Sequence, residues 1–412
     1  MPILNIAAKS LLNNKARTAL TILGIVIGIA AVIIVMSAGE SLKGLVVGQL
    51  DSFGSNVIQI EVKVPTASNT SVENAAGQAQ GIQITTLKLK DAEAIGRLPN
   101  IGNYYAAIMD SEIVSYQNEA KSVTIIGATP GYAEIGTARV DRGRFYTEEE
   151  DNELARVAVL GSGVAGKLFG NQDPLGQEIK MGSTKFRIIG VMAEQGGSFG
   201  ISFDDMILTP LQTLQKIIMG IDHLQWITAE MIETAKDAQT VEDISYLLRA
   251  SHQIEDTNKE DFSVTTMAEA KEMIDTIFNG ITLLLIAIAG ISLLVGGVGI
   301  MNIMYVSVTE RTFEIGLRKA VGAPKKAILW QFLLEAMILT VSGGIFGIAF
   351  GIAFSYLISY IAGRFGFDWA FILPPQSIII AFGFSAVVGL VFGYYPASQA
   401  AKMDPIEALR RD

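Results

Sequence analysis

The sequence has no cysteine and only two histidines among its 412 residues. Without cysteine there are no disulfides or thiolate metal ligands, so any folded part must be held together by packing alone. His223 and His252 stand far apart, with no zinc-binding HExxH pattern around either. The acidic run Glu148–Asp151 does not have the spacing of a calcium loop and is more typical of a solvated helix start. We therefore predict no catalytic or metal site in this chain.

Charged residues are also scarce. They make up 17% of the chain, against roughly 25% in ordinary soluble domains, so part of the chain is expected to lie in lipid. A bilayer is crossed by about 20 apolar residues. Four runs are long enough: Ala19–Ala38, Ile277–Val308, Phe332–Ala362 and Ile378–Ala397. The first is too long for a signal peptide and lacks a good cleavage site, so we retain it as a span.

The distribution of basic residues predicts the orientation. Three segments are rich in lysine and arginine beside a span: the N-terminal tail, the link after the second span, with Arg311, Arg318, Lys319, Lys325 and Lys326, and the C-terminal tail. By the positive-inside rule these belong in the cytoplasm. The stretch of more than 200 residues between the first two spans is then extracytoplasmic, and it is long enough for a folded core. The net charge of −10 lies mostly there and does not indicate nucleic-acid binding.

We therefore expect an α-helical membrane protein with four transmembrane helices and a large α+β extracytoplasmic domain. The expected parts, in order, are a cytoplasmic interfacial helix (1–17), transmembrane helix 1 (18–38), a stalk helix (39–55), a first extracytoplasmic part (56–129), an inserted part (130–220), a second part of the first lobe (221–265), a stalk helix (266–276), transmembrane helix 2 (277–306), a short cytoplasmic helix (307–326), transmembrane helix 3 (327–362), an outer loop (363–376), transmembrane helix 4 (377–396) and a cytoplasmic tail (397–412). The tail is expected to break at Pro396 and to restart as a helix near Asp404–Arg411.

The pattern of apolar, polar and glycine residues changes along the extracytoplasmic stretch. Its first part is predicted to contain a strand at 56–62, a mobile loop at 65–83, a helix at 87–99 and strands at 112–116 and 122–128. Short β-branched runs between glycine turns follow, from residue 130 to 220. After residue 220 a strand, the helix Thr240–Ile254 and another strand repeat the first pattern. This order predicts one α/β lobe interrupted by a mostly-β insertion.

One sequence resembles a phosphate-binding loop but lacks an essential residue. Gly161–Lys167 fits G-x-x-x-x-G-K, yet Leu168 stands where serine or threonine must bind magnesium. The predicted topology also places it outside the cytoplasm. We therefore expect a chain that does not hydrolyse ATP and binds no cofactor of its own.

Small residues and one acid mark the spans. Helix packing is predicted at Gly24, Gly28, Gly343, Gly347 and Gly351, because such rows let helices approach closely. Glu335 is the ionisable residue near the start of the third span. An acid in this place is a functional candidate, but Lys325 and Lys326 are near in sequence, so we favour a structural pairing with a base over proton coupling.

The short link after the second span carries the most specific pattern. As a helix, Glu310–Ala323 places Phe313, Leu317 and Ala320 on one stripe. The run E-R-T-x-E-I-G-L-R-K-A-V-G-A, followed by I-L-x-Q-F-L-L-E-A, resembles the permease signature of MacB-like ABC transporters. The tail P-A-x-x-A-A-x-x-x-P-I-E-A-L-R resembles the C-terminal signature of that family, and the opening NNKARTALTILGIVIGIAAVI resembles its first span. The resemblance covers nearly the whole chain.

This resemblance implies a permease whose outer part has two lobes, called Porter and Sabre in the family. Thr309–Ala323 would be the coupling helix that docks on an ATPase subunit, with ATP and magnesium held by that subunit. The residues implied in coupling are Glu310, Arg311, Glu314, Ile315, Gly316, Arg318, Lys319, Ala320, Gly322 and Ala323. The matching C-terminal residues are Pro396, Ala397, Ala400, Pro405, Ile406, Glu407, Ala408, Leu409 and Arg410. MacB itself carries a fused ATPase, whereas this sequence begins at the membrane, so we expect a separate ATPase.

The expected function is efflux of drugs, peptides or other amphiphiles, which are taken from the outer leaflet or the periplasm by a complex in the cytoplasmic membrane of a prokaryote. Two ATPases act on two permeases, either two copies of this chain or this chain with a related permease, and ATP-driven movement is transmitted mechanically to the extracytoplasmic domain. An adaptor protein is a further expected partner. Within the superfamily, a lipoprotein-releasing permease of the LolC/LolE type is an alternative. Two other classes remain open: an FtsX-like relay that activates a cell-wall hydrolase, and a membrane-anchored receptor without an ATPase.

Overall fold

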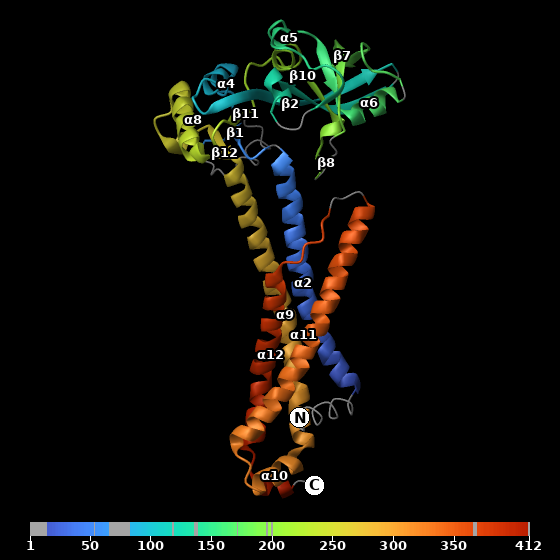
Figure 1. Cartoon of the computed structure of the whole chain (residues 1–412), viewed down its shortest axis with the longest axis vertical. Helices are drawn as coiled ribbons and strands as arrows, with labels where there is room; N and C mark the ends of the chain where they lie inside the picture. The colour runs from blue at the N-terminus through green and yellow to red at the C-terminus, as the bar shows by residue number, and fades with distance from the viewer. Residues whose placement is uncertain are drawn as a thin grey trace. The chain divides into compact units, whose positions relative to one another are not determined.

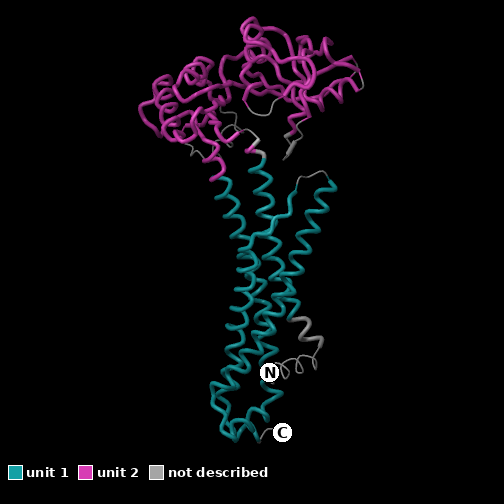
Figure 2. Tube along the Cα trace, in the orientation of Figure 1, with its two compact units in different colours: residues 1–48, 273–412 teal, residues 49–272 magenta. Residues whose placement is uncertain are grey.

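The computed structural model of this chain describes residues 15–52, 54–65, 83–117, 119–135, 139–170, 172–194, 197–198, 201–365 and 369–410. The chain divides into two compact units, Met1–Gly48 with Met273–Asp412, and Gln49–Glu272 (Figure 2). We call them the membrane unit and the sheet unit. The expected helix at 1–17 and the expected loop at 65–83 lie largely outside the described residues.

Within the part of the chain that the structure describes, four helices are long and apolar enough to span a bilayer, and their apolar parts lie in the membrane unit. They are α2 (Lys15–Ser52), α9 (Met267–Glu310), α11 (Lys325–Arg364) and α12 (Pro375–Lys402) (Figure 1). The described residues of this unit also form two short helices, α10 (Thr312–Ala320) and α13 (Pro405–Arg410). Each expected stalk is continuous with its span, because α2 and α9 run unbroken from one unit into the other.

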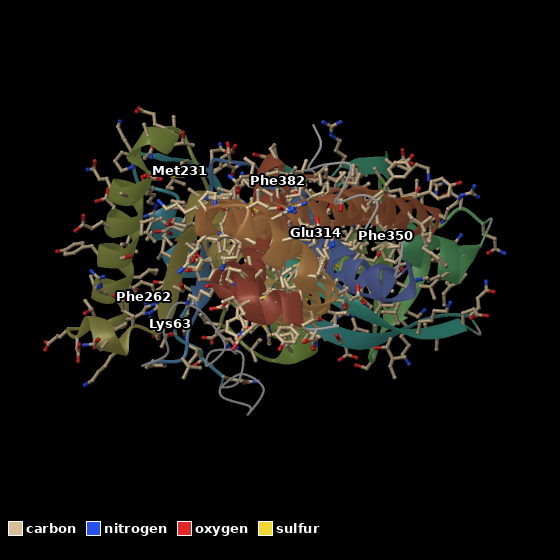
Figure 3. The ribbon with its side chains drawn as sticks, turned by 90° about the horizontal axis from the view of Figure 1, so that it is seen from below. Lys63, Met231, Phe262, Glu314, Phe350 and Phe382 are labelled. Atoms are coloured by element: carbon tan, nitrogen blue, oxygen red, sulfur yellow. The ribbon has the colours of Figure 1, made fainter. Side chains whose placement is uncertain are left out.

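The long helices expose apolar side chains as well as burying them. Ile281, Leu284 and Ile288 of α9 are about half exposed or more. Phe350 on α11 and Phe382 on α12, both labelled in Figure 3, are 58% and 48% exposed. A helix that is apolar on nearly all sides is stable in lipid, where these side chains have an apolar solvent.

Glycines allow the long helices to pack closely within this chain. On α2, Gly24 and Gly28 face α9, and on α11 the row of Gly343, Gly347 and Gly351 faces α2. A Cβ atom at Gly347 would lie 2.8 Å from the Cβ of Ile29, so only glycine fits this approach without a shift of the neighbouring helix.

The last helix extends further than the sequence suggests. Pro396 lies inside α12, which continues to Lys402, so the expected break at Pro396 is wrong. Proline removes one backbone hydrogen bond from a helix and strains the preceding turn. Here Ala397 and Ala400 just beyond it are fully buried in the core of the membrane unit, and this packing offsets the loss. The chain then restarts at Pro405 as α13.

The sheet unit is built on one ten-stranded sheet. Its strands are β1 (Val57–Val62), β2 (Ile101–Tyr116), β3 (Glu119–Ala128), β4 (Val140–Gly143), β5 (Val157–Leu160), β6 (Glu178–Met181), β7 (Thr184–Met192), β10 (Met206–Pro210), β11 (Trp226–Met231) and β12 (Phe262–Thr266). The α-helices among its described residues are α4 (Leu89–Ile95), α5 (Glu148–Asn152), α6 (Ser162–Phe169), α7 (Leu211–Thr213) and α8 (Asp237–His252), and a small hairpin pairs β8 (Gly197–Ser198) with β9 (Ile201–Ser202).

The strand order separates the inserted part from the parts that flank it. The order is β12-β1-β11-β2-β3-β10-β5-β7-β4, with β6 pairing β2 and β7. Strands from the two flanking segments form one half of the sheet, and those from residues 130–220 form the other. The halves are joined by the parallel pair β3–β10, where Ile125 is in register with Ile207, and by β6 against the end of β2. The expected α/β lobe with an inserted β part is therefore one continuous sheet.

Both faces of this sheet are buried. Along β2, Ala106 and Ile108 point into a core that also holds Ile95 of α4 and Leu248 of α8. Ala107, which lies between them in the alternation of a strand, belongs with Tyr105 to a second core on the opposite face. In Figure 1, α4 and α8 lie together beside β1 and β12.

Candidate functional site

The short helix α10 has defined ends. It begins after Arg311, whose backbone (φ −104°, ψ 17°) interrupts α9. It ends at Gly322, which has a φ of +98°, the left-handed conformation that suits glycine after a helix. The N–H groups of Gly322 and Ala323 donate to carbonyls of the last turn, and Pro324 follows. This is the Schellman arrangement, so the sequence G-A-P fixes where α10 stops.

The inner face of α10 packs on the C-terminal helix. Ile315 is 3% exposed and lies in the core of the membrane unit. Gly316 lies against α13, where a Cβ at that position would come within 2.7 Å of the Cβ of Ala408. Ala408 is itself 1% exposed. The two stretches that carry the sequence resemblance are therefore in contact with each other.

Two arginines connect α10 to the base of α11. The Nη1 atom of Arg311 lies 3.3 Å from Oε2 of Glu335, and their side chains are 18% and 6% exposed. Arg318 donates to Oε1 of Gln331 at 2.5 Å and to Oε1 of Glu314 at 2.6 Å (Glu314 is labelled in Figure 3). The base that pairs with Glu335 here is thus Arg311 of the preceding link.

Lys319 connects α10 to the end of α12. Its Nζ donates to the carbonyl of Ala401 at 3.0 Å and to that of Met403. A cation at this place satisfies free carbonyls at the helix C-terminus and matches its partial negative charge. Burial lowers the pKa of Lys319, and the charge of Lys325 lowers it further, with Asp404 opposing. Apart from the presence of a basic residue, nothing in the sequence indicates this contact.

The outer face of α10 is apolar and exposed. Phe313, Leu317 and Val321 are 58%, 50% and 83% exposed, and we call these three the α10 apolar row. Ala320 beside them is exposed, as is Ile406 of α13. The spacing of four residues places the row on one side of the helix. The predicted stripe contained Phe313, Leu317 and Ala320, and it missed Val321 because that residue follows the last full turn.

The remaining predicted residues divide between the core and the surface. Buried are Pro396, Ala397 and Ala400, and exposed are Glu310, Glu407 and Leu409, while Pro405 opens α13 and Arg410 ends it.

In the sheet unit, His252 lies between two carboxylates that the sequence did not associate with it. Its Nδ1 is 2.8 Å from Oδ1 of Asp261, and its Nε2 is 3.5 Å from Oδ2 of Asp91. Asp91 also accepts hydrogen bonds from the backbone of Lys88 and the hydroxyl of Ser251. Burial alone lowers the pKa of His252, but the two carboxylates raise it to about 9. The cluster therefore ties α4, α8 and the start of β12 together through a charged imidazolium.

Two other sequence predictions concern the sheet unit. Asp151 is 3% exposed, so the interpretation of Glu148–Asp151 as a solvated run is wrong at this residue. It accepts the N–H of Gln212 at 2.8 Å, and burial raises its pKa to about 6. Lys167, in the sequence that resembles a phosphate loop, forms an ion pair with Asp205 at 2.5 Å. Among the described residues, no His, Cys, Asp or Glu group is arranged to hold a metal ion.

Comparison with known proteins gives matches over almost the whole chain. Residues 18–247 match the MacB-like periplasmic core domain, and residues 286–405 match the FtsX-like permease C-terminal domain. The macrolide export ATP-binding/permease protein MacB of Bdellovibrio bacteriovorus is 38% identical over 404 residues, which are 98% of this chain and 60% of that protein. The pyoverdine export ATP-binding/permease protein PvdT of Pseudomonas entomophila is 36% identical over 400 residues, 96% of this chain and 57% of that protein. The crystal structure of the periplasmic region of MacB from Actinobacillus actinomycetemcomitans matches with a TM-score of 0.46 at 21% identity, covering 55% of this chain and 95% of that one.

Four membrane-length helices with these two domains define a membrane permease that carries a large extracytoplasmic domain. The chain belongs to the MacB-like family of ABC transporter permeases, with a C-terminal part of the FtsX type. It spans about 60% of the length of the curated MacB relatives.

Proposed function

We propose that this chain is the permease of an ABC exporter, and that an ATPase of the ABC class docks on the α10 apolar row. The supporting observation is the division of α10 into two faces. Its inner face is held by α11, α12 and α13, whereas Phe313, Leu317 and Val321 are exposed next to basic residues. An apolar row at the end of a bundle, outside the spans, is the kind of surface that an amphipathic helix presents to a groove on a partner.

Movement of α10 passes to the spans through the contacts of its inner face. From there α2 and α9 carry it beyond the membrane, because each is a single helix whose backbone hydrogen bonds are satisfied internally. The ion pair between Lys43 of α2 and Asp275 of α9, at 3.0 Å, holds these two helices together past their most apolar parts. ATP hydrolysis by the partner thereby drives motion of the extracytoplasmic domain.

The transported molecules are amphiphiles such as drugs or peptides. The names of the relatives support this class, since one exports macrolides and another pyoverdine. The working unit has two permeases and two separate ATPases, which hold ATP and magnesium, and an adaptor protein continues the route. Both chain ends and α10 face the cytoplasm of a prokaryotic cell.

The docking proposal is tested by photo-crosslinking in intact membranes. A benzoylphenylalanine is placed at Phe313 or Val321, and at two matched exposed positions, Tyr246 in the sheet unit and Phe350 on α11. We expect positions 313 and 321 alone to capture a protein that contains an ABC ATP-binding domain. Capture of that protein from position 246, or its absence at both α10 positions in membrane-inserted protein, would refute the proposal. With the captured ATPase identified, Phe313→Asp should lower its co-purification at least 10-fold, and Tyr246→Asp should not.

The orientation is tested with single cysteines, since the natural chain has none. Val321→Cys and Tyr246→Cys place a thiol at side chains that are 83% and 74% exposed. A membrane-impermeant maleimide should label the cysteine at position 246 in intact cells and that at 321 only after permeabilisation. The reverse pattern would invert the proposed topology.

A further inference from the structure

The ion pair between Arg311 and Glu335 stands out among the contacts of α10, because its carboxylate is almost completely buried. Glu335 is 6% exposed in its side chain, and its neighbours Phe332, Leu333 and Ala336 on α11 are all buried. Removing a carboxylate and a guanidinium from water is costly, and their attraction only roughly compensates for it.

Stability alone does not require this pair. The same interface between α10 and α11 already contains apolar packing, since Ile315, Ile328 and Phe332 are all 3% exposed or less and belong to one core. Buried ion pairs can often be replaced by apolar side chains of similar size without loss of stability. What such a pair supplies is a defined geometry, because only one arrangement of the helices satisfies both charges.

The geometry that the pair defines is the rotation of α10 about its own axis. Two contacts hold α10 against α11: Arg311 contacts Glu335, and Arg318 contacts Gln331. The two arginines are two turns apart, and their partners are one turn apart on α11. Lys319 fixes the other side through the carbonyls that end α12. A helix held from two sides presents Phe313 in one direction.

We propose that Arg311 and Glu335 are positioning residues, which orient the α10 apolar row for the ATPase and carry its movement into α11. This inference rests on the proposed docking of an ATPase at that row. It assigns to Glu335 a coupling role through Arg311, in place of a proton-relay role or a purely structural one.

The experiment compares four forms of the full chain, assembled in nanodiscs with the ATPase captured at position 313. They are Glu335→Gln, the exchange Arg311→Glu with Glu335→Arg, the apolar pair Arg311→Met with Glu335→Leu, and the control Arg142→Met, which removes an exposed ion pair with Asp173 in the sheet unit. For each form we measure membrane yield, the amount of bound ATPase, and ATP hydrolysis per assembled complex relative to the free ATPase.

We expect Glu335→Gln to lower hydrolysis per complex at least 10-fold, and the exchanged pair to recover it to within about 3-fold of the natural chain. The apolar pair should reach normal yield yet remain at least 5-fold low in hydrolysis, a difference that a structural role would not produce. Natural hydrolysis by the apolar pair, or a well-inserted exchanged pair with no recovery, would overturn the inference. If Phe313→Asp leaves ATPase binding unchanged, the docking proposal itself fails, and that outcome is separate from the behaviour of the pair.

Discussion

Stability of the sheet unit should fall as the pH rises from 6.5 to 9, because of His252. The side chain is 2% exposed and lies between two carboxylates, and its pKa is raised from 6.5 to about 9. Between these values the folded chain holds a proton that the unfolded chain has released, so its stabilising effect is complete below pH 6.5 and is lost as the pH rises through 9. At 1.36 kcal/mol per pKa unit, the effect is about 3 kcal/mol.

The two carboxylates beside His252 set the lower limit of the pH range in which the cluster stabilises the fold. Burial raises the pKa of Asp91 and Asp261, but hydrogen bonds from His252 and from neighbouring groups outweigh it, and both pKa values lie below the ordinary 3.8. Their contribution is present above pH 3.8 and is lost as the pH falls through the lowered values. The cluster should therefore stabilise the fold most between about pH 4 and 6.5.

The measurement is simplified by the composition of the chain, since His223 is the other histidine. In ¹³C-histidine-labelled His223→Gln protein in nanodiscs, the remaining imidazole should titrate near pH 9. Unfolding in denaturant, followed by Trp226 in a Trp330→Phe and Trp369→Phe background, should lose about 3 kcal/mol between pH 6.5 and 9.5. In His252→Gln this pH dependence should vanish. An imidazole that titrates at or below 6.5, or an unchanged pH dependence in the variant, would refute the assignment.

Three further predictions concern single positions. Gly347→Ala should destabilise the membrane unit by about 1–3 kcal/mol, because its Cβ would meet Ile29 at 2.8 Å, whereas Gly383→Ala, with open space around it, should be neutral or slightly stabilising in the same thermal assay. Because the pKa of Asp151 is raised to about 6, the natural chain should gain about 2 kcal/mol of stability when the pH falls from 7.5 to 4. Asp151→Asn should lack this gain, and at pH 7.5 it should be as stable as the natural chain or more so. A clear loss of stability at pH 7.5 would contradict this. Gly322→Ala should speed hydrogen exchange in the last turn of α10 by roughly 5–30-fold, because a φ of +98° costs residues other than glycine about 1–2 kcal/mol. Nothing obstructs the new methyl group, so the effect reports the backbone conformation alone. Unchanged exchange would show that the turn does not depend on this residue.

Local signals in the sequence were sufficient to locate the membrane helices, although not the end of α12. Length and apolarity identify all four membrane helices, and the G-A-P sequence from Gly322 to Pro324 marks the end of α10. The helical periodicity of the sequence also predicts that Phe313 and Leu317 lie on one side of α10. These properties depend on residues within a few turns of each other, so no tertiary information is needed.

Non-local contacts explain what the sequence could not provide. The partner of Glu335 is 24 residues away, across the turn between two helices, and nearer lysines were equally good candidates. The 16-residue strand β2 was expected only at 112–116, since its first part is specified by pairing with β11 rather than by its own alternation. Asp151 is buried because α7 packs over it. Continuation of α12 through Pro396 depends in the same way on the buried alanines that follow.

The length of α10 bears on how the proposed coupling works. A helix of nine residues is too short to be stable by itself in water, where about 12–15 residues are marginal. It must therefore derive its stability from Ile315, Gly316 and the contacts of its basic side chains with α11 and α12. A partner that pulls on the exposed row then acts on a helix that cannot keep its shape without the bundle. Displacement of α10 must either move α11 and α12 with it or unfold the helix, and the ion pair at Glu335 favours the first outcome because separation would leave a buried charge without its guanidinium.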